Sequence, residues 1–266
     1  MYQGTYINTE HTRIERLIEN VANPYHGLAE QRAQLDLLHQ LNERHQRARA
    51  ADPQLESRIQ SFELAYRMQM DATDAFDIQR EPEHVRRMYG EGTQARQLLI
   101  ARRLLERGVR FVQVWHGAGQ PWDNHDDIES NHRRLAKESD QPIGALLSDL
   151  KQRGMLDDTL VIWGGEFGRT VYCQGTLTET NYGRDHHPRC FSIWLAGAGI
   201  KGGTVYGETD EMSYNVVKNP VHIRDLHATI LQLMGLHHEK LSFKFQGLDQ
   251  RLTGVLPAKV VQGILA

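Results

Sequence analysis

The feature that most constrains the fold is an alternation of short apolar runs with longer helical patterns after residue 92. Three apolar runs stand out, at 111–115 (FVQVW), 159–163 (TLVIW) and 191–196 (FSIWLA). Runs of this length, bounded by turn residues, predict buried strands. Strands separated by helices indicate a parallel sheet covered on both faces. We therefore expect an α/β fold with a mostly parallel sheet flanked by helices.

Glycines mark where the helices of this region should end. The helical patterns run over 94–106, 127–153 and 223–234, and the glycines that follow them are Gly108, Gly154 and Gly235. A glycine just past a helix readily adopts the left-handed conformation that ends it. We expect the second helix to restart near Asp140, because Pro142 suits a first turn.

The first third of the chain reads as helical. Residues 28–48 are charged and rich in Gln, with Leu38 and Leu41 at helical spacing, and a second helix is predicted over 53–70 after a break at Asp52. In the second helix the apolar residues share one face, the pattern of an amphipathic helix. The chain is therefore expected to divide into a mainly helical segment, 1–92, and an α/β domain, 93–266.

Charge and hydropathy exclude several classes of function. The net charge is −3, and the basic residues of the first third are interleaved with acidic ones, so no nucleic-acid partner is expected. No apolar run approaches the roughly 18 residues of a membrane span. The first residues, MYQGTYINTEHTRIERL, lack the apolar segment of a signal peptide, and localisation stays open. The only two cysteines, Cys173 and Cys190, match no zinc spacing.

Three polar segments adjoin the predicted strands and carry carboxylates and imidazoles. They are 116–125 (HGAGQPWDNH), 164–170 (GGEFGRT) and 183–188 (GRDHHP). In parallel sheets, chemistry lies in the loops beyond the strand ends. Each segment alone is more typical of a turn or a solvated surface histidine. Together, at one sheet edge, they predict a site for a divalent cation.

These same motifs carry a family resemblance. The combination of WDNH, GGEFGRT and GRDHHP resembles the sulfatase-like family catalogued as domain of unknown function 1501, within the alkaline phosphatase and sulfatase superfamily. The segment 143–166 resembles the helix, turn and strand that precede a metal-binding pair in those enzymes. The resemblance covers about residues 55–265. It implies a partial alkaline-phosphatase-like sheet in 93–266.

The resemblance also implies a set of ligands. Asp123, His125, Glu166 and His186 fall on or near metal-binding positions, with His187 as the alternative to His186. Phe167 replaces a neighbouring ligand, so one ion or none is expected rather than two, with zinc, manganese or calcium as candidates. Two arginines, Arg169 and Arg184, could fork onto a sulfate or phosphate group or pair with local carboxylates.

The function that follows is a metal-dependent hydrolase-like protein acting on a small anionic ester, a sulfate or a phosphate. The resemblance implies a chain that corresponds to the family's C-terminal half, with the nucleophile in a missing N-terminal half. Association with that half, or self-association through an exposed sheet edge, is then expected. The alternative is a non-catalytic descendant that binds an anionic ligand or a partner protein. A dinucleotide-binding reading of 197–202 (GAGIKG) is rejected, because no helix start follows it.

Overall fold

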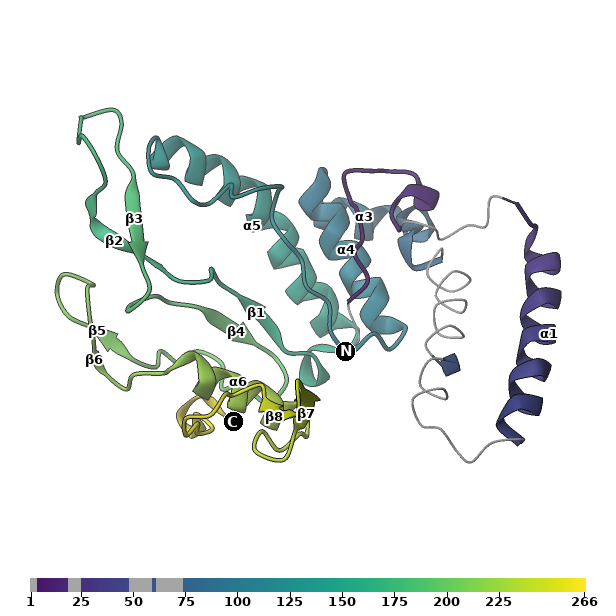
Figure 1. Ribbon diagram of the computed structural model, residues 1–266. Coiled ribbons are helices and arrows are strands. Elements are labelled where there is room, and N and C mark those ends of the chain that lie inside the picture. Colours follow the sequence, from purple (N-terminus) through teal and green to yellow (C-terminus); the bar gives the residue numbers. More distant parts are fainter. Residues whose placement is uncertain (1–3, 19–24, 48–58, 61–73) are drawn as a thin grey trace. The chain divides into compact units, whose positions relative to one another are not determined.

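The computed structural model describes residues 4–18, 25–47, 59–60 and 74–266, and it is a mixed α/β structure with short antiparallel strand pairs (Figure 1). The chain divides into two compact units. Unit 1 contains Met1–His116 and Glu138–Leu146, and unit 2 contains Gly117–Lys137 and Leu147–Ala266.

The regular secondary structure of unit 1, where the structure describes it, is helical. Its helices are α1 (Leu28–Arg47), α3 (Glu83–Tyr89) and α4 (Thr93–Glu106), with single 3-10 turns at Ile14–Arg16 and Ile78–Arg80. The predicted helices at 28–48 and 94–106 are therefore confirmed. The predicted helix at 53–70 lies outside the described residues except for 59–60. A small core of Leu17, Phe76 and Ile100 holds α4 to the preceding segments.

A buried ion-pair network also ties α4 to the segment before α3. Arg102 has no exposed side-chain surface, and its Nη2 lies 2.7 Å from Glu81 Oε2. Arg103 forms an ion pair with the same carboxylate and donates from Nε to the Ala75 carbonyl at 2.9 Å. Burial alone would raise the pKa of Glu81, but hydrogen bonds from both guanidinium groups hold it below its ordinary value. The network therefore contributes to the stability of unit 1 only while Glu81 is ionised.

One continuous helix, α5 (Ile128–Gln152), replaces the two predicted for 127–153. The predicted restart near Asp140 is wrong, because Pro142 lies inside the helix. A proline removes one backbone hydrogen bond and normally interrupts a helix. Here buried positions continue at helical spacing on both sides of it, namely Leu135, Ala145, Leu146 and Leu150. Burial along this face offsets the lost hydrogen bond.

The glycine stops were predicted correctly for α4, α5 and α6 (Ile223–Leu233). Each of Gly108, Gly154 and Gly235 has a positive φ. In each case the next residue donates back to the third residue from the helix end, as Met155 N does to the Leu150 carbonyl at 2.8 Å. The glycine N–H makes a second bond at each end, as Gly154 N does to the Lys151 carbonyl. Together the two turn hydrogen bonds satisfy carbonyls that a helix end leaves free.

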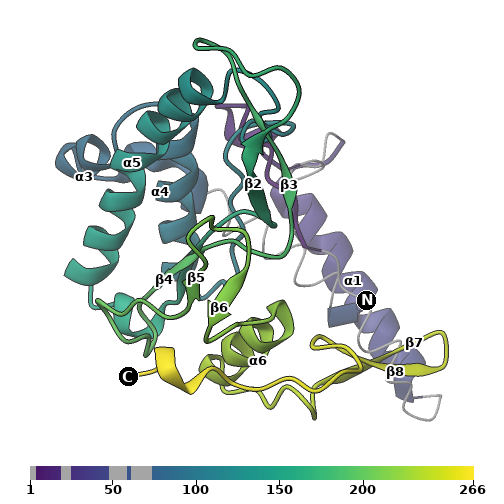
Figure 2. The same ribbon diagram turned by 90° about the vertical axis from the view of Figure 1, so that its left-hand side faces the viewer.

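Unit 2 holds four two-stranded sheets among its described residues, all antiparallel. The pairs are β1 (Val161–Trp163) with β4 (Trp194–Ala196), β2 (Gly168–Cys173) with β3 (Arg184–His187), β5 (Glu208–Thr209) with β6 (Val216–Lys218), and β7 (Ser242–Phe245) with β8 (Leu248–Arg251). The β2–β3 and β5–β6 hairpins are visible in both orientations (Figures 1 and 2). Single 3-10 turns occur at Leu156–Asp158 and Gln262–Ile264.

The predicted parallel sheet is not found among the described residues. The run 111–115 forms no strand, and its Phe111 and Trp115 are 72% and 69% exposed. The other two runs do contain strands, β1 and β4, but these pair antiparallel. Between them the chain passes through the β2–β3 hairpin rather than a helix, and only parallel neighbours require a helical crossover.

The last helix, α6, anchors the C-terminal segment through two side chains. Asp225 closes the first turn with His222 and accepts a hydrogen bond from Lys259 N at 2.9 Å. Thr229 accepts one from Val261 N, also at 2.9 Å. Asp225 therefore caps α6 and also fixes the C-terminal segment. No helix in the described part of the chain has the length and apolar character needed to cross a membrane.

Candidate metal centre

The register of the β2–β3 hairpin decides which side chains face the candidate site. Arg169 pairs with His186, and Gly168 pairs with His187. Residues directly opposite each other on paired strands share a face, and their neighbours point the other way. Arg169 and His186 therefore project together. His187 is turned to the opposite face, where its Nε2 lies 2.6 Å from the Tyr214 carbonyl and its ring stacks on Tyr214.

The loop that carries Asp123 and His125 is fixed beside this hairpin. Trp122 meets Trp163 of β1 edge-on, with ring centroids 6.5 Å apart. On the other side, Arg184 N donates to the Asn124 carbonyl at 3.1 Å. At Gly183 the backbones approach so closely that an added Cβ would lie 1.9 Å from the His125 carbonyl carbon. Only glycine fits at that position.

Three of the four predicted ligands come together. Asp123 Oδ1 lies 3.0 Å from His125 Nε2 and 2.9 Å from His186 Nε2. One ligand atom from each of these residues lies within 4.8 Å of the others, and the two imidazole rings are 5.1 Å apart. We call Asp123, His125 and His186 the triad. They come from two segments about 60 residues apart in the chain, which the loop and the β2–β3 hairpin bring to one point.

Two further residues support the triad imidazoles. Gln174, one residue past β2, contacts His125 Nδ1 through its Oε1. Because Gln174 Oε1 can only accept, His125 Nδ1 carries the proton of this contact. The other ring nitrogen, Nε2, faces the Asp123 carboxylate. The Phe167 ring packs against His186 at 4.7 Å between centroids. Sequence reasoning missed Gln174, because an uncharged glutamine beyond a strand end carries no signal of its own.

The fourth predicted ligand, Glu166, lies outside the triad. Its side chain is 66% exposed, and its Oε1 is 3.5 Å from Arg169 Nη2. Arg169 itself forms a hydrogen-bonded ion pair with Asp123 Oδ1. Burial alone would raise the pKa of Asp123, but hydrogen bonds from His186 and Arg169 and the positive charge of Arg169 hold it below its ordinary value. The carboxylate therefore stays ionised at neutral pH.

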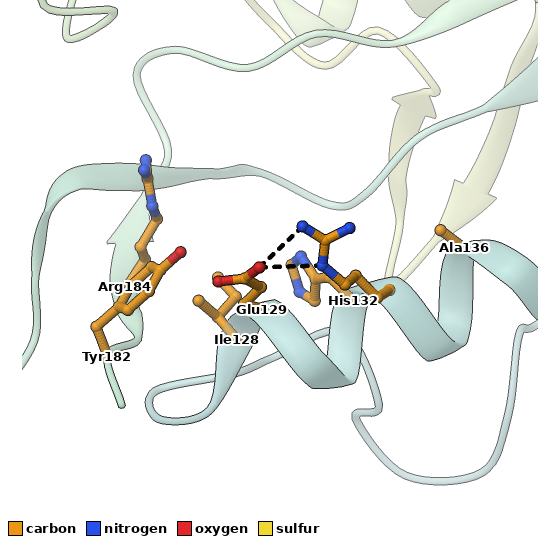
Figure 3. A pocket seen from close by; sticks show the side chains of 7 residues that line it. Ile128, Glu129, His132, Ala136, Tyr182 and Arg184 are labelled. Carbon is orange, nitrogen blue, oxygen red and sulfur yellow. Dashed lines mark hydrogen bonds and ion pairs between the residues drawn. The ribbon is translucent and has the colours of Figure 1, made fainter. Parts of the chain in front are cut away.

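Arg184, the second predicted anion-binding residue, is held by the backbone of the β2–β3 hairpin. Its Nη1 donates to the Thr170 carbonyl at 3.1 Å. Figure 3 shows it with Tyr182 on one side of an open hollow, facing the first turns of α5. The α5 residues that line the hollow include His132 and the ion pair of Glu129 with Arg133. Arg169 therefore contacts the triad carboxylate, whereas Arg184 contacts the Thr170 carbonyl.

The triad offers two imidazole nitrogens and one carboxylate oxygen. This is a common ligand set for a single catalytic zinc or similar divalent ion, with coordination positions left for other ligands. The atoms converge without any change of fold, and His125 already has the orienting partner that metal-bound histidines usually have. The residues present therefore fit one cation.

Comparison with known proteins gives one match. The family model described as "Protein of unknown function (DUF1501)" matches residues 1–265. No curated protein and no solved structure matches the chain. The family match includes the first 54 residues, which lie outside the 55–265 assigned from motifs, so the helical N-terminal segment is part of the family pattern.

Proposed function

The chain belongs to the family described as Protein of unknown function (DUF1501), and since that description assigns no activity, we propose a function from the site itself. The protein holds one divalent cation at Asp123, His125 and His186 and acts with it on sulfate or phosphate esters. A divalent cation supplies Lewis-acid polarisation of an ester oxygen. The resemblance to the alkaline phosphatase and sulfatase superfamily, as a C-terminal part of such a fold, belongs to the same proposal.

The observation that carries the proposal is the convergence of the triad. Asp123 Oδ1 is within 3.0 Å of both imidazole Nε2 atoms. Two imidazoles with one carboxylate favour zinc or manganese, whereas calcium prefers a set made only of oxygen ligands. The strand face of His187 and its contact with the Tyr214 carbonyl favour His186 over His187 as the ligand.

The roles of the other residues follow from where they lie. Arg169 reaches the triad and presents a planar guanidinium, which suits a sulfate or phosphate group better than a point charge does. Arg184 would have to leave the Thr170 carbonyl to bind an anion, so we propose Arg169 as the first anion-binding residue and Arg184 as the second. No nucleophile in this chain is assigned. Turnover without one should be slow.

The test combines ester binding with hydrolysis. The purified chain is incubated with zinc or manganese and with p-nitrophenyl phosphate or p-nitrophenyl sulfate. We expect metal-dependent binding of one of these esters, and slow release of p-nitrophenol that stops on addition of a chelator. His186→Ala should lose both effects, and His237→Ala, which removes an exposed imidazole elsewhere, should keep them.

Ester binding and hydrolysis that are unchanged by chelator and by His186→Ala would contradict the proposal.

A second candidate function is supported by the ion pair between Arg169 and Asp123. A guanidinium already supplies the positive charge that this carboxylate needs, so the protein could bind an anionic ligand without metal or catalysis. In that case ester binding survives chelation and is lost in Arg169→Met. Measuring ester binding with and without chelator, in the wild type and in Arg169→Met, therefore separates the two functions.

A further inference from the structure

We infer that Arg169 is a displaceable cation at the metal site, and that Glu166 is the carboxylate that receives it when the metal binds. This inference rests on the proposed function and concerns the regulation of the same site. It gives Glu166 a role different from that of a ligand. It also makes the affinity for metal depend on where one guanidinium lies.

The starting point is the crowding of one oxygen atom. Asp123 Oδ1 is the common partner of His125 Nε2, His186 Nε2 and the Arg169 guanidinium. A divalent cation held by the triad would have to approach this same oxygen. Two positive groups that share one small site repel each other, and the repulsion is strong where water is partly excluded. Asp123 and Arg169 are both largely buried, so the repulsion is only partly screened.

The second step is that Arg169 has another partner within reach. Its Nη2 lies 3.5 Å from Glu166 Oε1, already an ion-pair distance. Its Cζ lies 5.5 Å from the centroid of the Phe167 ring, a cation–π distance. The Phe167 ring also packs against His186, so it lies between Glu166, its neighbour in the chain, and the triad. A small side-chain rotation could therefore exchange Asp123 for Glu166 and keep the aromatic contact.

The third step explains the position of Glu166. A carboxylate that ligated the same ion would be expected beside the triad, yet Glu166 is exposed and forms its ion pair with Arg169. An acceptor for a displaced guanidinium needs this placement. The sequence resemblance gave Glu166 a ligand position, and the geometry points to a supporting role instead.

Two consequences follow for binding. A cation at the triad releases Arg169 from Asp123. The released guanidinium can then donate two parallel hydrogen bonds to an anion. An anion that engages Arg169 in turn removes the competitor from Asp123. Metal and anion should therefore increase each other's affinity by the same factor, as reciprocal linkage requires.

The test is a double-mutant cycle on zinc affinity, measured by competition with a chromophoric chelator. The four proteins are the wild type, Arg169→Met, Glu166→Gln and the double variant. Removing the competitor should tighten zinc binding about tenfold in Arg169→Met, equivalent to about 1.4 kcal/mol. Glu166→Gln should weaken it in the wild type, because the displaced guanidinium loses its acceptor. In the Arg169→Met background, Glu166→Gln should change the affinity by less than about twofold.

Controls keep the outcomes distinct. Arg169→Lys retains the charge and should bind zinc nearly as the wild type does, and Arg169→Gln replaces Arg169→Met if the latter does not fold. Equal weakening by Glu166→Gln in both backgrounds would make Glu166 a ligand and overturn this inference. So would zinc binding by the wild type with unchanged or weaker affinity in Arg169→Met. Failure of all four proteins to bind zinc would instead reject the metal site of the proposed function, and this inference with it.

Discussion

At the scale of single residues, the ligands of the site are supported by uncharged residues to which sequence analysis assigned no role. Gly183 admits the β3 backbone against His125, and Gln174 holds the His125 ring by its Nδ1. The ligand types were readable from the sequence, because carboxylates and imidazoles in clusters are unusual. The supporting residues were not readable, because their importance comes from distances of a few ångströms between segments remote in the chain.

The choice between His186 and His187 shows this limit clearly. Both follow Asp185 in the sequence, and composition cannot separate them. The hairpin register opposite Arg169 and Gly168 separates them, since adjacent strand residues face opposite ways. A prediction of the register would have been needed, and register is set by pairing that the sequence states only weakly here.

Gln174→Ala should weaken zinc binding about 10- to 100-fold, because a hydrogen-bond partner at the free nitrogen of a metal-bound imidazole orients the ring and changes the metal affinity by that amount. The readout is zinc affinity by chelator competition. The matched control is Gln232→Ala, on the exposed side of α6, which should leave the affinity unchanged. An unchanged affinity in Gln174→Ala would show that His125 needs no orienting partner.

At the scale of helices and strands, helices were predicted well and sheets poorly. The glycines after α4, α5 and α6 end each helix through local hydrogen bonds, so the signal lies within a few residues. Strand pairing depends on remote segments. The run 111–115 has the composition of a buried strand but has no strand partner among the described residues. Pro142 was misread for the same reason, because burial along α5 outweighs a local preference.

The ion pairs of α4 lead to a prediction about acid stability. Glu81→Gln should destabilise unit 1 by about 3–5 kcal/mol, the usual cost of breaking a buried ion pair from one side. The reason is that Arg102 and Arg103 would lose the buried carboxylate that they share and would keep only the more exposed Glu106 and Asp74 as acidic partners. Urea unfolding monitored by circular dichroism measures the difference. Glu91→Gln, at an exposed site before α4, is the control and should have little effect.

The pH dependence of unit 1 follows from the same carboxylate. Folding holds the pKa of Glu81 below the ordinary value of 4.5. A lowered pKa means that the unfolded chain binds the proton more readily than the folded chain. The stabilisation is therefore complete above pH 4.5 and is lost as the pH falls toward the lowered value. Glu81→Gln should remove this part of the acid sensitivity, and equal acid slopes in both proteins would contradict the assignment.

At the scale of the whole molecule, the candidate site belongs to unit 2 alone. All residues of the triad, with Arg169, Glu166 and Gln174, fall within Gly117–Lys137 or Leu147–Ala266. The family match nevertheless extends over 1–265, so both units are part of one family pattern. The division at residue 92 that the sequence indicated stays a prediction.

This arrangement predicts where zinc should stabilise the backbone. Hydrogen exchange should slow on zinc addition in the triad loop, residues 123–128, and in the β2–β3 hairpin, because a ligand stabilises the state that binds it. Residues 95–103 of α4 in unit 1 should exchange at an unchanged rate. The comparison of both segments with and without zinc gives the result directly. Protection confined to unit 1 would place the cation elsewhere.

The central claim is that Asp123, His125 and His186 share one cation, and zinc K-edge X-ray absorption of the zinc-loaded chain tests it most directly. We predict one zinc per chain with only nitrogen and oxygen neighbours at about 2.0–2.2 Å. Two of these neighbours should be imidazoles, and one imidazole should remain in whatever zinc His186→Ala retains. A sulfur neighbour, no bound zinc, or two imidazoles still present in His186→Ala would contradict the claim.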